Sequence, residues 1–76
     1  MMLEKIKEII KTTFDKDISG ITLEMDILEE LGLNSLELAE LMFAVEEEFK
    51  IVIPDKDVVK FHIIEDIVIY LNKKIK

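Results

Sequence analysis

The sequence has no cysteine and no tryptophan, and only one proline and two glycines among its 76 residues. The absence of cysteine excludes disulfides and thiolate metal sites. Long apolar runs are also missing, because none approaches the roughly 18 residues that a membrane-spanning helix needs. Glu4 and Lys5 interrupt the first apolar residues, so we expect no signal peptide. These absences predict a cytoplasmic protein that does not insert into membranes.

A chain of 76 residues has room for one small core, so we expect a single domain over residues 1–76. Such a chain buries only about 60% of the surface that its unfolded form exposes. With so thin a core, a deep preformed active-site cleft is not expected. Half of the residues are hydrophobic and 36% are charged, which is typical of an amphipathic globular domain rather than a disordered segment.

Basic residues are absent from a long central stretch. All ten basic residues are lysines, and none lies between Lys16 and Lys50, where ten of the acidic residues fall. The net charge is −7. An acidic surface repels nucleic acid and attracts basic patches on other proteins. Charge alone favours the simpler interpretation of a solvated face that maintains solubility, so binding of protein partners stays open at this point.

Apolar residues recur at the i, i+3, i+4 spacing of a helix near the N-terminus and in the middle of the chain. The first helix is predicted over residues 2–14. The second is predicted to begin at Asn34 or Ser35 and to end near Phe49. Its buried stripe is predicted to comprise Leu38, Leu41, Met42, Val45 and Phe49.

The last third of the sequence predicts one short helix and one longer helix. Pro54 and the aspartates after it favour a helix start, so a short helix is predicted at about residues 55–60. The final segment is rich in β-branched residues, which also suit a strand. Acidic residues at its start and lysines at its end instead complement the dipole of a helix over residues 64–74. The predicted fold class is therefore all-α, a bundle of three main helices and a short one.

The connection over residues 16–34 is long for a compact domain, and such loops are usually functional or held down by anchors. Ser19 and Gly20 predict a turn within it. A turn of helix is expected at 26–31, with Gly32 at its C-terminal end. The apolar residues expected to anchor the connection to the core are Ile18, Ile21, Leu23, Ile27, Leu28 and Leu31.

Residues 15–26, DKDISGITLEMD, nearly match a calcium-binding loop. Its positions 1, 3, 5, 6 and 12 are held by Asp15, Asp17, Ser19, Gly20 and Asp26. Three features argue against calcium: Asp26 is shorter than the usual bidentate glutamate, Thr22 replaces a large aliphatic residue, and no second loop exists for pairing. We predict no metal site here, and retain an unmodified, calcium-responsive helical interaction domain as the alternative function.

The segment LGLNSLEL, residues 31–38, contains one hydroxyl among its leucines. Asn34 as N-cap places Glu37 at the third helical position, which is the pattern of a capping box. Ser35 is then not needed as a cap, and its hydroxyl is expected to point outward at the start of the helix. Gly32 and Leu33 are expected to shape the approach to it.

The surroundings of Ser35 do not suit a catalytic nucleophile. The only histidine is His62, far along the chain, and no adjacent base is evident. A phosphodiester on Ser35 would lie near unpaired N–H groups and the positive end of the helix dipole. Ser35 is therefore better suited as an acceptor that another enzyme modifies.

The stretch LGLNSLELAELMFAVEEEFKIVIPDKDV resembles the acyl carrier protein family. That family has a D-S-L motif after a leucine-glycine pair, a glutamate-rich helix with an E-E-x-F ending, and an I-P-D/E segment. The likeness extends more loosely over the whole chain. The matching residues here are Leu31-Gly32, Ser35-Leu36, Glu40-Leu41, Glu46-Glu47-Glu48-Phe49 and Ile53-Pro54-Asp55.

The resemblance implies a four-helix carrier that is not an enzyme. Ser35 is implied to carry covalent 4′-phosphopantetheine, whose thiol holds acyl groups as thioesters while the bundle shelters the acyl chain. The implied partners of this monomer are a phosphopantetheinyl transferase and acyl-processing enzymes with basic docking patches, in fatty acid, polyketide or specialised lipid biosynthesis. The residues implied to face these partners are Leu36, Glu37, Ala39, Glu40, Phe43, Glu46 and Glu47.

Two positions depart from the family pattern, and for a third residue the burial is undecided. Asn34 stands where the family usually has Asp, which keeps the cap but removes a charge beside the modification site. His62 stands where a small hydroxylated residue is common, and we expect a surface or capping role for it. Helical spacing leaves Phe43 either an exposed apolar anchor among acids or a core aromatic.

Overall fold

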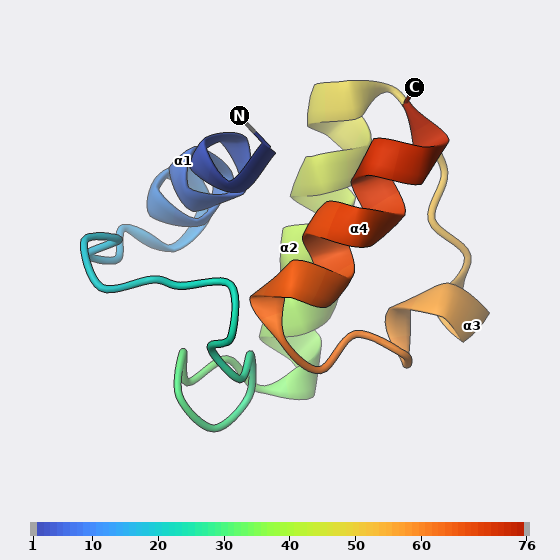
Figure 1. Cartoon of the computed structure of the whole chain (residues 1–76). Coiled ribbons are helices and arrows are strands. Elements are labelled where there is room, and N and C mark those ends of the chain that lie inside the picture. The colour runs from blue at the N-terminus through green and yellow to red at the C-terminus, as the bar shows by residue number, and fades with distance from the viewer. Residues whose placement is uncertain (1, 76) are drawn as a thin grey trace.

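The computed structural model describes residues 2–75 and confirms the all-α fold class. Within these residues no strand is assigned, and one isolated bridge pairs Asp26 with Ile63. Figure 1 shows the four helices in chain order. They are α1 (Met2–Phe14), α2 (Ser35–Phe49), α3 (Asp55–Val58) and α4 (Ile64–Lys74).

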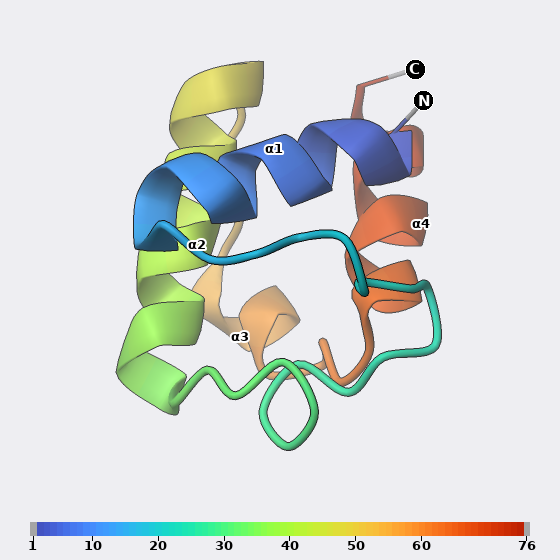
Figure 2. The same ribbon diagram turned by 90° about the vertical axis from the view of Figure 1, so that its left-hand side faces the viewer.

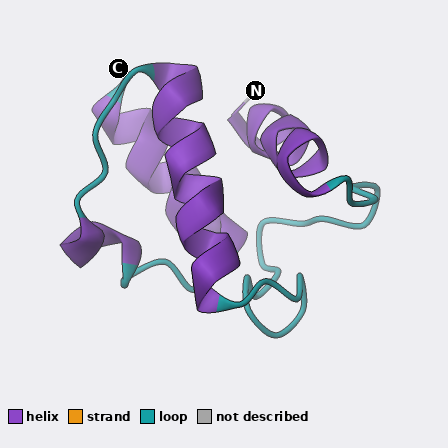
Figure 3. Ribbon diagram, turned by 180° about the vertical axis from the view of Figure 1, so that it is seen from behind, coloured by secondary structure: helices purple, strands orange, loops and turns teal. Residues whose placement is uncertain are grey.

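Helix α1 lies across both α2 and α4, as Figure 2 shows, and it contacts each of them. Helix α3 lies on the other side of these two helices from α1 (Figure 1). Seen from behind in Figure 3, the long connection leads from the end of α1 around one end of the bundle to the start of α2. The end of this connection is held by a hydrogen bond from the Leu33 N–H to the Ile27 carbonyl at 3.2 Å, just before α2 begins.

The core forms where the apolar stripes of α1, α2 and α4 meet. Four of the five residues predicted for the stripe of α2 are buried, and Phe49 is half-buried. Aliphatic burial of this kind stabilises a small domain by about 1.5–3 kcal/mol for each fully buried side chain. The side chains with no exposed surface are Ile6, Ile10, Ile27, Leu41, Val45, Ile64, Ile67 and Leu71.

The long connection is anchored by fewer residues than the sequence predicts. Ile21, Ile27 and Leu31 are buried, as expected, whereas Leu28 is 47% exposed. A prediction of an anchoring role for Leu28 is therefore wrong. Its N–H instead donates to Asp26 Oδ1 at 3.0 Å, in a turn that directs the side chain to solvent.

The turn of helix predicted at 26–31 is a hydrogen-bonded turn and not an assigned helix. The Asp26 carboxylate caps it by accepting the Glu29 N–H at 2.8 Å, and the Asp26 carbonyl accepts the Glu30 N–H at 3.1 Å. Gly32 follows with φ +86°, a backbone conformation that side chains disfavour. The left-handed conformation of Gly32 ends the turn, and the chain then leads to α2.

The connection also caps α4 through its backbone. The N–H groups of Ile64 and Glu65 donate to the carbonyls of Met25 and Leu23 at 3.1 and 2.9 Å. These N–H groups lie in the first helical turn, where no intrahelical acceptor exists. The Asp66 carboxylate accepts the N–H of the exposed His62 at 2.9 Å. His62 is exposed, which agrees with the expected surface role, and Ile63 gives α4 no side-chain N-cap.

Helix α3 spans Asp55–Val58, shorter than the predicted 55–60, and contains no buried residue. A side-chain contact joins it to α4: the Tyr70 hydroxyl donates to Asp57 Oδ2 at 2.7 Å. The Tyr70 ring also meets Phe61 edge to face, with centroids 5.2 Å apart. These two contacts hold α3 and the segment after it against α4.

Tyr70, the only tyrosine, is expected to titrate late. Burial, and then the hydrogen bond to Asp57 and its charge, raise the pKa of Tyr70 from 10.0 to about 12. Since the folded state holds this proton more tightly, its contribution to stability is complete below pH 10 and is lost as the pH rises toward 12. Tyrosinate absorbance should report the raised pKa, and Asp57→Asn should lower it; an unchanged pKa in that variant would contradict the contact.

Candidate functional site

Helix α2 begins with the predicted capping box. Asn34 has extended backbone angles, its Oδ1 accepts the Glu37 N–H at 2.7 Å, and Glu37 Oε1 accepts the Asn34 N–H at 3.1 Å. The pair satisfies two backbone donors that the helix itself leaves free. The cap of α2 is therefore complete without the hydroxyl of Ser35.

Ser35 is the first residue of α2 and is exposed to solvent. Leu36 beside it is 71% exposed, whereas Leu33 before it is only 2% exposed. The expectation that Leu33 shapes the approach to Ser35 is wrong, because its side chain is buried in the core. Leu33 instead anchors the chain immediately before the helix, and its N–H donates to the Ile27 carbonyl at 3.2 Å.

The outer face of α2 combines apolar and acidic side chains. Phe43 is 64% exposed, so the alternative that it is a core aromatic is wrong. Ala39, Glu40 and Glu47 are also exposed. Leu36, Ala39 and Phe43 follow the i, i+3, i+7 spacing of one helix face, and a contiguous exposed apolar patch is typical of a surface that contacts a partner.

Two glutamates of the predicted partner face also have a structural role. Glu37 and Glu46 are both half-buried. Glu37 belongs to the capping box, and Glu46 Oε2 accepts the Ile53 N–H at 2.6 Å. Glu46 thereby ties the end of α2 to the segment before α3. The capping motif predicted the role of Glu37 from the sequence, but no local pattern connects Glu46 with a residue seven positions away.

Glu46→Ala should lower the free energy of unfolding by about 1–3 kcal/mol, because the half-buried Ile53 N–H loses its acceptor. The adjacent Glu47→Ala should change it by less than about 0.5 kcal/mol, since Glu47 is exposed. Urea unfolding of both variants measures the difference. Equal effects would show that the contact of Glu46 contributes nothing to stability.

The residues of the near-calcium loop do not converge. Asp15 directly follows the last residue of α1 and has a left-handed backbone conformation with φ +56°. Its N–H donates to the Lys11 carbonyl. Asp17 Oδ1 accepts the Ser19 N–H at 3.0 Å, which lowers the pKa of that carboxyl. Across residues 2–75, no three acidic or histidine side chains are placed to hold one metal ion. This geometry gives no support to the calcium-responsive alternative.

None of the helices described between residues 2 and 75 has the length and apolar character that a membrane span requires.

Comparison with known proteins identifies the family of the chain. Residues 4–71 match the family model described as a phosphopantetheine attachment site, which defines the class as a phosphopantetheine-bearing carrier domain. The acyl carrier protein of Onion yellows phytoplasma is 44% identical over 96% of both chains. That of Bdellovibrio bacteriovorus is 39% identical over 92% of this chain and 90% of its own.

The acyl carrier protein of Clostridium acetobutylicum is a third relative, 38% identical over 95% of this chain and 94% of its own. The chain belongs to the acyl carrier protein family. The resemblance seen in the sequence is confirmed, and with it the prosthetic group 4′-phosphopantetheine and the role of a carrier rather than a catalyst. Members of this family act with a phosphopantetheinyl transferase and with acyl-processing enzymes, most commonly in fatty acid biosynthesis.

Proposed function

We propose that Ser35 is the residue that carries 4′-phosphopantetheine, through a phosphodiester on its hydroxyl. The observation that carries this proposal is the position of Ser35: exposed, first in α2, and released from capping by the Asn34–Glu37 pair. The sequence contains one other serine, Ser19, which lies in the loop after α1 and has no helix start beside it.

The start of α2 has the chemistry that a phosphodiester requires. Helical geometry leaves the first N–H groups without intrahelical acceptors, and those of Ser35 and Leu36 are not used by the capping box. These donors and the positive end of the helix dipole favour a negatively charged group. Asn34, being neutral, adds no repulsion toward the phosphate where an aspartate would.

The attached group supplies the thiol on which an acyl chain is held as a thioester. The residues of this chain supply position and shelter. Leu33 and the capping box keep Ser35 at a defined place, and the aliphatic core between the helices offers an apolar environment for the acyl chain. We propose acyl intermediates of fatty acid or related polyketide and specialised lipid synthesis as the load.

The outer face of α2 is the proposed surface for partner enzymes. Leu36, Ala39 and Phe43 supply its apolar contacts, and Glu40 and Glu47 supply exposed charge that attracts basic patches. Glu37 and Glu46 contribute charge to the same helix although their carboxylates bind backbone N–H groups. The partners proposed are a phosphopantetheinyl transferase and acyl-processing enzymes.

Reversal of charge at Glu40 and Glu47 should slow acyl transfer to and from partner enzymes. Each exposed pair contributes only about 0.2–1 kcal/mol, so the loss should appear mainly as a lower, salt-dependent association rate. Thermal melting should change little, because neither side chain is buried. Stopped-flow association at low and high salt measures the effect; a large loss of stability with intact transfer would contradict the docking role.

We further propose that the chain works as a cytoplasmic monomer and as a single domain over residues 1–76. The net charge of −7 supports the monomeric state, because copies of the same charge repel each other. It also supports the absence of nucleic acid among the partners, because a polyanion is repelled as well.

The intact mass of the chain after co-expression with a phosphopantetheinyl transferase tests the proposed function. The expected mass exceeds that of the unmodified chain by one phosphopantetheine, and the product should then accept an acyl group as a hydroxylamine-sensitive thioester. An unmodified mass with several transferases would contradict the proposal.

A further inference from the structure

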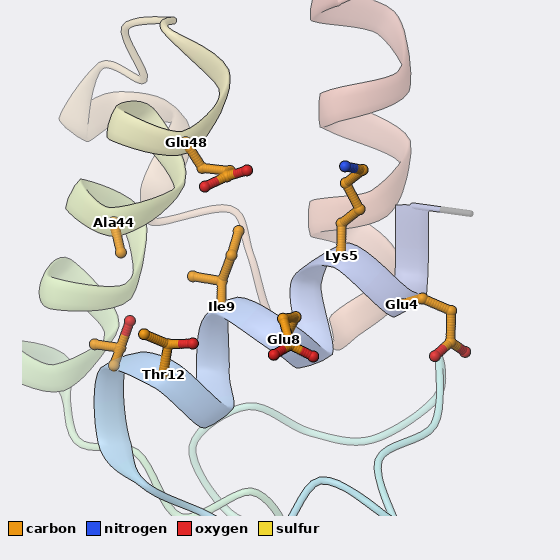
Figure 4. A pocket seen from close by; sticks show the side chains of 8 residues that line it. Glu4, Lys5, Glu8, Ile9, Thr12, Ala44 and Glu48 are labelled. Atoms are coloured by element: carbon orange, nitrogen blue, oxygen red, sulfur yellow. The ribbon is translucent and has the colours of Figure 1, made fainter.

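A groove of about 470 Å³ runs between α1 and α2, and none of its lining residues belongs to the proposed partner face. Figure 4 shows its lining side chains. Ile9 lies in the groove, with Ala44 and Glu48 on the side of α2. The charged residues that α1 contributes to the lining are Glu4, Lys5 and Glu8.

The lining has an apolar floor and a negatively charged rim. Ile9 is 9% exposed and Ala44 is half-buried, so a side chain seated above them would meet aliphatic surface. Three carboxylates, those of Glu4, Glu8 and Glu48, oppose the single ammonium of Lys5. Such a surface complements an apolar side chain that is flanked by cations.

The groove continues toward the proposed partner face of α2. A second hollow, of about 450 Å³, is lined by Thr13 and Ala44, which also line the first. Its remaining lining residues are Ala39, Glu40 and Phe43, which belong to the partner face. A protein seated on that face therefore lies beside residues that also line the first hollow.

We propose that the α1–α2 groove is a further docking surface, which takes a basic segment of an acyl-processing enzyme with an aliphatic or aromatic side chain between two cationic ones. The proposal rests on the proposed function, since the partner is one that also engages α2. A second copy of this chain and an anionic lipid surface are both disfavoured by the net charge of −7. The groove would fix the orientation of the partner while the arm on Ser35 reaches its active site.

The test compares reversals of equal charge inside and outside the groove. Glu8→Lys with Glu48→Lys changes the rim, whereas Glu24→Lys with Glu29→Lys makes the same change in total charge at exposed positions of the connection. Each protein is first loaded with phosphopantetheine. The probe is a purified condensing enzyme from Clostridium acetobutylicum, the source of a 38% identical relative. The quantity measured is kcat/KM for acyl transfer, together with the melting temperature.

The groove pair should lower kcat/KM about tenfold and the control pair by no more than about twofold, because of these two pairs only the groove pair meets the partner. Lys5→Glu, which makes the rim more acidic, should raise kcat/KM about twofold and serves as an independent readout should the groove pair melt early. Equal losses in the two pairs, or no gain from Lys5→Glu, would overturn the groove as a docking surface. Failure of the parent chain to load would instead overturn the assignment of Ser35.

Discussion

Ser35→Ala is expected to abolish attachment of 4′-phosphopantetheine completely while leaving the fold intact. The hydroxyl is the only group of the Ser35 side chain that the attachment needs. Asn34 and Glu37 cap α2 without it, and the side chain is exposed. Substitution at such a position should change the free energy of unfolding by no more than about 0.5 kcal/mol. Intact mass after incubation with a transferase and coenzyme A, together with circular dichroism, measures both results.

The matched control is Ser19→Ala, which removes the other serine. This variant should accept phosphopantetheine at the rate of the parent chain. Modification that persists in Ser35→Ala and disappears in Ser19→Ala would move the attachment site to the loop after α1.

Ile27→Ala should destabilise the protein by about 2–5 kcal/mol, the usual cost of truncating a fully buried isoleucine. The Ile27 side chain has no exposed surface, and its backbone links the connection to the segment before α4 through the His62 carbonyl at 2.9 Å. It also accepts the Leu33 N–H at 3.2 Å. Loss of this anchor should therefore loosen the chain that leads to Ser35, and slow its modification as well as lower the urea midpoint.

Leu28→Ala removes the same number of carbon atoms from the next position and is the control. Leu28 is 47% exposed, so the same truncation should cost far less than at Ile27. Similar urea midpoints for the two variants would show that the connection is not held by Ile27.

Local sequence patterns predicted the three long helices well. The segments 2–14 and 64–74 agree with α1 and α4, and Asn34 marked the start of α2 through a capping box that involves only neighbouring residues. Helical periodicity and dipole complementarity outweighed the β-branched composition of the last segment, because one face of that helix is buried by α1.

The connection could not be predicted in the same way, since its structure depends on distant backbone groups. The carbonyls of Leu23 and Met25 satisfy the first N–H groups of α4, and no side-chain pattern encodes such contacts. Leu28 illustrates the result: its apolar character predicted burial, but the turn that Asp26 caps leaves it exposed.

The candidate site likewise has features that adjacent residues predict and features that depend on packing between distant segments. Ser35 and its release from capping follow from adjacent residues, and the sequence predicted both. The exposure of Phe43, the contact of Glu46 with Ile53 and the groove over Ile9 arise from the packing of α2 against other segments. Helical periodicity shows which residues share a face of the helix, but it does not predict which face a neighbouring helix leaves exposed.

Peptide mapping of the loaded chain by tandem mass spectrometry tests the central claim most directly. The chain has only two serines, so proteolysis that separates Ser19 from Ser35 distinguishes every serine attachment. We predict one phosphopantetheine per chain, on the peptide that contains Ser35, with a free thiol that accepts an acyl group. Phosphopantetheine on the peptide that contains Ser19, or on no serine at all, would contradict the account.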